Sequence, residues 1–134
     1  MQGRVLIIAG SDSGGGAGIQ ADIKTVTALN GFAMSAITAL TAQNTKGVHG
    51  IWDVPEEFVR QQIHVVLEDI GADCIKTGML SHSAIIKAVS DEIEGFTKTI
   101  PLIVDPVMVA KGGASLLAQE AVNSVKERLI PKAY

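Results

Sequence analysis

The stretch VLIIAGSDSGGGAGIQAD, residues 5–22, decides the fold class of this chain. It begins with a short continuous apolar run, Val5–Ala9, which is typical of a strand buried on both faces of a sheet. A glycine-rich segment follows, and from Ile19 onward the apolar residues recur at helical spacing. A buried strand that leads through a glycine loop into a helix predicts an α/β fold with a parallel sheet.

The rest of the chain repeats this alternation of apolar runs and amphipathic segments. Further strands are predicted at Met34–Thr38, Cys74–Thr77 and Leu102–Val104, with Val48–Trp52 as a small extra strand or flap. Four helices are predicted, with apolar stripes that begin at Ile19, Val59, Ile85 and Leu117. Gly31 and Gly71 are expected to end the first two of these helices. We therefore expect one domain with three layers, α/β/α, around a mainly parallel sheet.

Composition excludes several classes of protein. The chain has 134 residues, of which 47% are hydrophobic and only 4% aromatic, so the core must be aliphatic. Its net charge is −3 and its 11 lysines and arginines are scattered, which argues against binding to nucleic acid. The single cysteine, Cys74, excludes an internal disulfide and suits a protein of the cytoplasm. No apolar run is long enough to predict a membrane span.

The glycine-rich segment matches neither standard phosphate-binding fingerprint. A dinucleotide fingerprint starting at Gly14 would need a third glycine where Ile19 stands, and no glycine pair precedes the Lys-Ser/Thr of a P-loop. Free N–H groups at a helix N-terminus would still suit an anion or a flat ring, and Asp22 would accept a hydrogen bond from a ligand. A tight structural turn without a ligand is the alternative.

In parallel α/β sheets, ligands bind beyond the carboxyl ends of the strands. This rule selects four segments, which are also rich in glycine and polar residues: Gly10–Asp22, Thr41–Gly47, Gly78–Ser81 and Asp105–Gly113.

Each of these segments offers a candidate residue with a plainer structural alternative. The Gln43 amide could bind an amino-substituted nitrogen heterocycle; the alternative is that it caps local backbone groups. Met79 suits the wall of a ring site, or ordinary core. Asp105 could bind a hydrated Mg²⁺ near phosphates, or could simply stabilise a turn. Lys111 could bind a phosphate, or could be an ordinary solvated surface lysine. Lys76 lies in an apolar strand and needs a partner, either in the protein or in a ligand.

Four motifs occur in an order that resembles a known family. The segments GSDSGGGAGIQADIKT, ITALTAQNTKGV, IKTGML and IVDPVMVAKGG resemble the hydroxymethylpyrimidine/phosphomethylpyrimidine kinases of thiamine biosynthesis, which belong to the ribokinase-like superfamily. The resemblance implies an enzyme that uses ATP and Mg²⁺ to phosphorylate 4-amino-5-hydroxymethyl-2-methylpyrimidine and then its monophosphate. It also implies a small-molecule substrate and a homodimer.

The resemblance also implies roles for individual residues. Asp22 and Gln43 would bind the aminopyrimidine edge, and Met79 and Val107 would pack against the ring. Asp105 would lie near Mg²⁺ and the transferred phosphate. The complete set of implied substrate contacts is Gly10, Ala17, Asp22, Gln43, Met79 and Val107.

One departure from the family pattern concerns the phosphate machinery. Members of the family are about twice as long, and their second half carries a Gly-Thr-Gly-Cys or Gly-Thr-Gly-Asp motif that forms the anion hole. This motif is absent here. We therefore expect residues 1–134 to be the pyrimidine-binding, N-terminal half of such a kinase, inactive without the nucleotide-binding half. A non-catalytic pyrimidine-binding module and a pyridoxal-type kinase are the alternatives.

Overall fold

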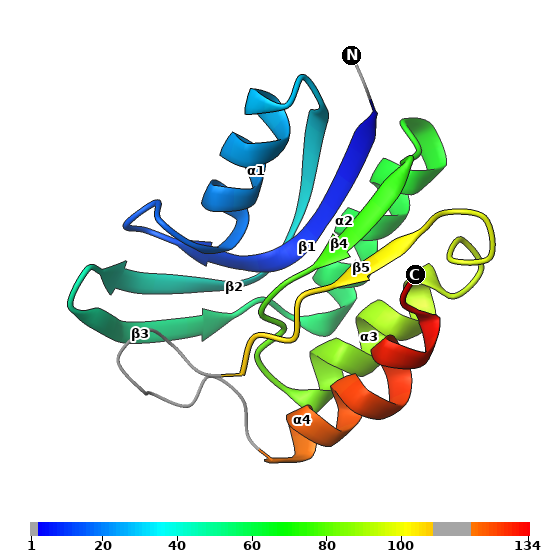
Figure 1. The fold of residues 1–134 in the computed structure, drawn as a ribbon. Coiled ribbons are helices and arrows are strands. Elements are labelled where there is room, and N and C mark those ends of the chain that lie inside the picture. Colours follow the sequence, from blue (N-terminus) through cyan, green and yellow to red (C-terminus); the bar gives the residue numbers. More distant parts are fainter. Residues whose placement is uncertain (1–2, 109–118) are drawn as a thin grey trace.

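A computed structural model describes residues 3–108 and 119–134, which form a five-stranded sheet flanked by helices. The strand order is β3-β2-β1-β4-β5, and only β3 runs antiparallel to its neighbour (Figure 1). The predicted strands and the extra strand are confirmed, with β1 and β2 longer than expected. Their bounds are β1 (Arg4–Asp12), β2 (Phe32–Asn44), β3 (Gly47–Asp53), β4 (Cys74–Thr77) and β5 (Leu102–Val104).

Helices cover both faces of this sheet, as the predicted three-layer α/β/α arrangement requires. The helix α1 lies on one face, while α2 and α3 lie on the other (Figure 1). The bounds are α1 (Gly18–Ala28), α2 (Glu56–Asp69), α3 (Ser83–Ile93) and α4 (Gln119–Ser124). The fourth predicted helix continues past α4 as a π-helical turn and then a 3₁₀ turn. No helix in the described ranges is both long and apolar enough to cross a bilayer.

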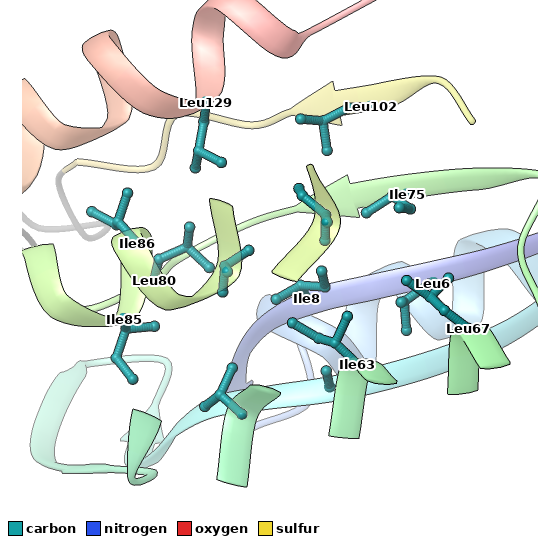
Figure 2. Packing of buried hydrophobic residues seen from close by; sticks show 14 of the residues in the cluster. Leu6, Ile8, Ile63, Leu67, Ile75, Leu80, Ile85, Ile86, Leu102 and Leu129 are labelled. Atoms are coloured by element: carbon teal, nitrogen blue, oxygen red, sulfur yellow. The ribbon is translucent and has the colours of Figure 1, made fainter. Parts of the chain in front are cut away.

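The central strand β1 is apolar on both faces because each face has its own core. Leu6 and Ile8 point into the larger cluster, against Ile63 and Leu67 of α2 (Figure 2). Their neighbours Ile7 and Ala9 point the opposite way, toward α1. Side chains alternate along a strand, so a strand covered by helices on both sides needs an unbroken apolar run.

The ends of α1 and α2 use different residues for the left-handed turn. Gly71 has φ +71° after α2, as predicted. The prediction for Gly31 was wrong, because Asn30 takes the left-handed conformation after α1, with φ +62°. Asparagine tolerates this region because its short polar side chain bonds locally. Gly31 instead permits close approach, since a Cβ there would lie 2.7 Å from the Val26 side chain.

The glycine loop between β1 and α1 is ordered by a buried carboxylate of the protein itself. Asp12 is 6% exposed, and its oxygens accept hydrogen bonds from the backbone N–H groups of Gly14, Gly16 and Ala17 at 2.8–2.9 Å. The expectation of N–H groups free for a ligand is therefore wrong for these three loop residues. The Asp12 carboxylate thus orders, from within the protein, the loop that leads into α1.

Gly18 is the position in this loop where another residue is least tolerated. Its φ is +55°, and an added Cβ would collide with the carbonyl oxygen of Gly10. The backbone at the start of α1 lies in close contact with the backbone near the end of β1. This contact is possible only if this residue has no side chain.

A surface ion pair joins β1 to the start of β4 at the opposite end of the sheet. Arg4 donates to both carboxylate oxygens of Asp73, at 2.9 and 3.1 Å, and its backbone N–H donates at 2.8 Å. These hydrogen bonds lower the pKa of Asp73 to about 2. The exposure of both side chains limits the contribution of the pair to stability.

We predict that Asp12→Asn lowers the free energy of unfolding by about 1.5–3 kcal/mol, because an amide nitrogen would then face backbone donors that now bond a carboxylate. Urea unfolding of the purified chain measures this change. Asp69→Asn, at the exposed end of α2, is the control and should change stability by less than about 0.5 kcal/mol. Equal effects of the two substitutions would contradict the role of Asp12 in ordering the loop.

We predict a small acid-dependent loss of stability from Asp73. A carboxyl with a lowered pKa in the folded state stabilises the fold above its unfolded pKa of about 4. That contribution is lost as the pH falls from about 4 toward 2. Unfolding curves of the wild type and Asp73→Asn should therefore converge over this interval. A constant difference between the two proteins from pH 6 to pH 2 would contradict the assignment.

Candidate functional site

The carboxyl ends of the parallel strands and the start of α1 surround a cavity of about 320 Å³. This is the location that the strand-end rule predicts. The structure brings seven of the predicted site residues to this cavity, while Lys111 lies outside the described residues. The seven are Gly10, Ala17, Asp22, Gln43, Met79, Asp105 and Val107.

Close contact between β1 and the segment after β4 forms one wall of the cavity. The Gly10 N–H donates to the Met79 carbonyl at 3.1 Å, and the Thr38 hydroxyl donates to the same carbonyl at 2.8 Å. A Cβ on Gly10 would lie 2.7 Å from the Met79 methyl group. Glycine therefore lets the Met79 thioether lie against the strand, where it presents a soft apolar surface to the cavity.

Gln43 is held at the end of β2 by the glycine loop. Its backbone N–H and carbonyl both pair with the Ser13 hydroxyl at 2.8 Å. Its side-chain oxygen lies 3.2 Å from the Thr41 hydroxyl. The Thr41 hydroxyl donates its one proton to the Ser11 carbonyl at 2.8 Å, so the Gln43 amide keeps both a donor and an acceptor for a ligand.

An ion-paired cluster joins three separate elements at the cavity. Lys76 Nζ of β4 lies 2.7 Å from Asp22 Oδ2 of α1 and 3.4 Å from Asp105 Oδ2, just after β5. The side chains of Lys76 and Asp22 are 20% and 24% exposed, while that of Asp105 is 51% exposed. The partner of Lys76, which the sequence left open, is therefore the protein.

The segments that the strand-end rule selected also contribute cavity residues that the sequence analysis did not name individually. Asp12 lies at the bottom of the glycine loop and also borders a second hollow of about 200 Å³, next to Gln43 and the β2–β3 turn. Its signal in the sequence was weak: an aspartate followed by glycines at the second and fourth positions resembles any polar turn. The lining is completed by Ala9, Ser11, Gly18, Ala21, Thr41 and Gly78.

Asp105 is a suitable ligand for a hydrated divalent cation, because it is the more exposed of the two carboxylates that pair with Lys76. Mg²⁺ keeps several waters and binds through one or two carboxylates together with substrate phosphates. The described residues hold no cluster of three or more acidic, histidine or cysteine side chains that could form a complete metal site. The donor set thus fits a cation shared with a phosphate ligand.

Cys74 does not contribute a nucleophile. It lies in β4, and burial raises the pKa of its thiol above the ordinary value. A raised pKa disfavours the reactive thiolate. The prediction of a plain strand residue at this position is consistent with that environment.

Together these residues line a cavity whose chemistry suits a flat polar ring. Met79 and Val107 offer apolar surface, Asp22 offers an acceptor and Gln43 a donor. Asp105 lies at the mouth of the same cavity, where a cation or a phosphate could approach.

Comparison with known proteins identifies the family. The family model described as phosphomethylpyrimidine kinase matches residues 12–134. The chain is 58% identical over 133 residues to the hydroxymethylpyrimidine/phosphomethylpyrimidine kinase of Bacillus subtilis (strain 168), covering 98% of this chain and 48% of that protein. The chain thus spans about half the length of the curated relatives it matches.

Solved structures agree with this match and with the expected ribokinase-like fold. A phosphomethylpyrimidine kinase from Clostridium difficile 630 superposes with a TM-score of 0.91 at 46% identity, over 98% of this chain and 56% of that chain. The pyridoxal kinase of Staphylococcus aureus in complex with AMP-PCP and pyridoxal gives a TM-score of 0.79 at 34% identity, over 97% and 45% of the two chains. The chain belongs to the phosphomethylpyrimidine kinase family.

Proposed function

We propose that this chain forms the pyrimidine-binding part of a kinase that transfers phosphate from ATP to 4-amino-5-hydroxymethyl-2-methylpyrimidine and then to its monophosphate. Membership in the family supports the class of reaction. The observation that carries the choice of substrate is the meeting of the Asp22 carboxylate and the Gln43 amide at one cavity.

These two side chains match the hydrogen-bonding edge of an aminopyrimidine. A carboxylate only accepts, so Asp22 pairs with the amino group of the ring. The NH₂ group of Gln43 donates to the adjacent ring nitrogen, much as amide side chains bind adenine. Met79 and Val107 pack against the ring, and Gly10 and Ala17 let it approach the backbone.

The acidic end of the cavity is where the reacting group would lie. Asp105 would hold Mg²⁺ through water, and the metal would neutralise charge on the phosphates. Lys111 is proposed as a phosphate contact. The glycine loop is not available for this purpose, because its N–H groups already bond Asp12.

The remaining phosphate machinery is expected in sequence that this chain does not contain. Phosphoryl transfer depends on positioning and on charge stabilisation, which an anion hole supplies in this family. The chain spans about half of its relatives, so we propose that residues 1–134 alone bind pyrimidine without turning it over.

A pyridoxal-type activity is the second candidate, favoured by the likeness to a pyridoxal kinase that binds pyridoxal and AMP-PCP. The pairing of a carboxylate with an amide donor suits an aminopyrimidine better than a pyridine aldehyde. We therefore place the aminopyrimidine first.

The central test is phosphorylation by the full-length protein that carries these residues. With ATP and Mg²⁺ it should convert hydroxymethylpyrimidine to the monophosphate and diphosphate, as followed by ³¹P NMR. Residues 1–134 alone should bind the pyrimidine in calorimetry and yield no product. Absence of any phosphorylated pyrimidine from the full-length protein would refute the proposal, and phosphorylation of pyridoxal alone would favour the second candidate.

We predict that Gln43→Glu in the full-length protein lowers kcat/KM for hydroxymethylpyrimidine at least about tenfold, mainly through KM. The substitution keeps the shape of the side chain but replaces its donor with a second acceptor facing the ring nitrogen. Gln119→Glu, on the exposed side of α4, is the matched control and should leave both constants unchanged. An unchanged KM in Gln43→Glu would contradict the proposed contact.

A further inference from the structure

We propose that Lys76 is a positioning residue that makes the cavity select a ring with an N–H donor, by holding the Asp22 carboxylate toward the ligand. This inference rests on the proposed function, because it concerns the same cavity. It assigns a role to a side chain that the substrate contacts described above do not include.

The position of Lys76 in the sheet calls for an explanation. In the strand register it lies between Ile7 of β1 and Ile103 of β5, in a segment that otherwise suits apolar residues. Its side chain is only 20% exposed, so this lysine has lost most of its contact with water. Burying a lysine in this way costs free energy unless the charge is paired, and the pair that it makes lies at the cavity.

The geometry of the pair restrains Asp22. The helix α1 carries Asp22 to within 2.7 Å of the Lys76 ammonium, which engages Oδ2. Within the described ranges no other side chain donates to Asp22, so this one bond sets the direction of the carboxylate. The Oδ1 atom remains as the acceptor for a ligand, and Asp22 lines the cavity.

Asp105 fixes the ammonium from the other side. Its Oδ2 atom lies 3.4 Å from Lys76 Nζ, so the cation is held between two anions that belong to separate elements. Without the ammonium these two carboxylates would repel each other across the cavity, and Asp22 would be free to turn away. Lys76 therefore determines where the acceptor points.

A fixed carboxylate discriminates between ligands that differ at one substituent. It accepts a hydrogen bond from an amino group, whereas a ring carbonyl at the same position would present a second acceptor and leave both groups unpaired. Loss of the restraint should weaken binding of the amino ligand and relieve the repulsion that rejects the oxo ligand. The ratio of the two affinities is thus the quantity that Lys76 controls.

The test measures this ratio by calorimetry in the full-length protein. The probes are 4-amino-5-hydroxymethyl-2-methylpyrimidine and its 4-oxo counterpart. The variants are Lys76→Met, which removes the charge, and Lys76→Arg, which keeps it. Lys87→Met is the control, because it removes a lysine from a more exposed ion pair outside the cavity, with Asp91 2.6 Å away on α3.

The wild type should prefer the amino ligand, and Lys76→Met should reduce the affinity ratio at least about tenfold. Lys76→Arg should keep most of the preference for the amino ligand. Lys87→Met should keep that preference unchanged. If Lys76→Met does not fold, Lys76→Gln provides the same comparison.

Two results would overturn the inference while leaving the proposed function intact. In one, the wild type prefers the amino ligand but Lys76→Met weakens both ligands by the same factor, as a merely structural role would. In the other, Lys76→Arg loses the preference as completely as Lys76→Met. A wild type that binds neither ligand would instead refute the proposed function, and the inference with it.

Discussion

The site depends on the hydrogen bonds that the Asp12 carboxylate makes with the glycine loop. This carboxylate lies at the end of the central strand and accepts hydrogen bonds from the backbone of Gly14, Gly16 and Ala17. These bonds hold the glycine loop in one conformation and satisfy three of its backbone N–H groups, just before α1 begins. An internal anion thus occupies the place where many α/β proteins bind a phosphate, so the loop can serve as a wall for a different ligand.

The ordered loop sets the direction of α1, and α1 in turn carries Asp22 to the cavity. Gly18 permits this close start of the helix because it has no side chain to meet the Gly10 carbonyl. Across the sheet, Lys76 bonds Asp22 and approaches Asp105, so that α1, β4 and the end of β5 are tied together by charge. The cavity is therefore held by polar contacts at one end of the sheet, above the aliphatic core.

Much of the architecture could be predicted from local patterns. The apolar run of β1 and the helical stripes have periods that depend only on which faces are buried, so strands and helices could be assigned without knowledge of their partners. The candidates Asp22, Gln43 and Met79 followed from the rule that ligands bind at strand ends. The role of Asp12 could not be predicted in this way, since its partners are backbone groups whose directions depend on the folded loop.

The sequence by itself determined the α/β class, the burial of β1 on both faces and the polar segments that line the cavity, because each depends on residue type and spacing. Only the tertiary structure decided that Asn30 rather than Gly31 takes the left-handed turn, and that the glycine-loop N–H groups are occupied. It also decided that the partner of Lys76 is Asp22, 54 positions away in the sequence. Such pairings depend on distances between segments remote in the chain, and no local pattern encodes those distances.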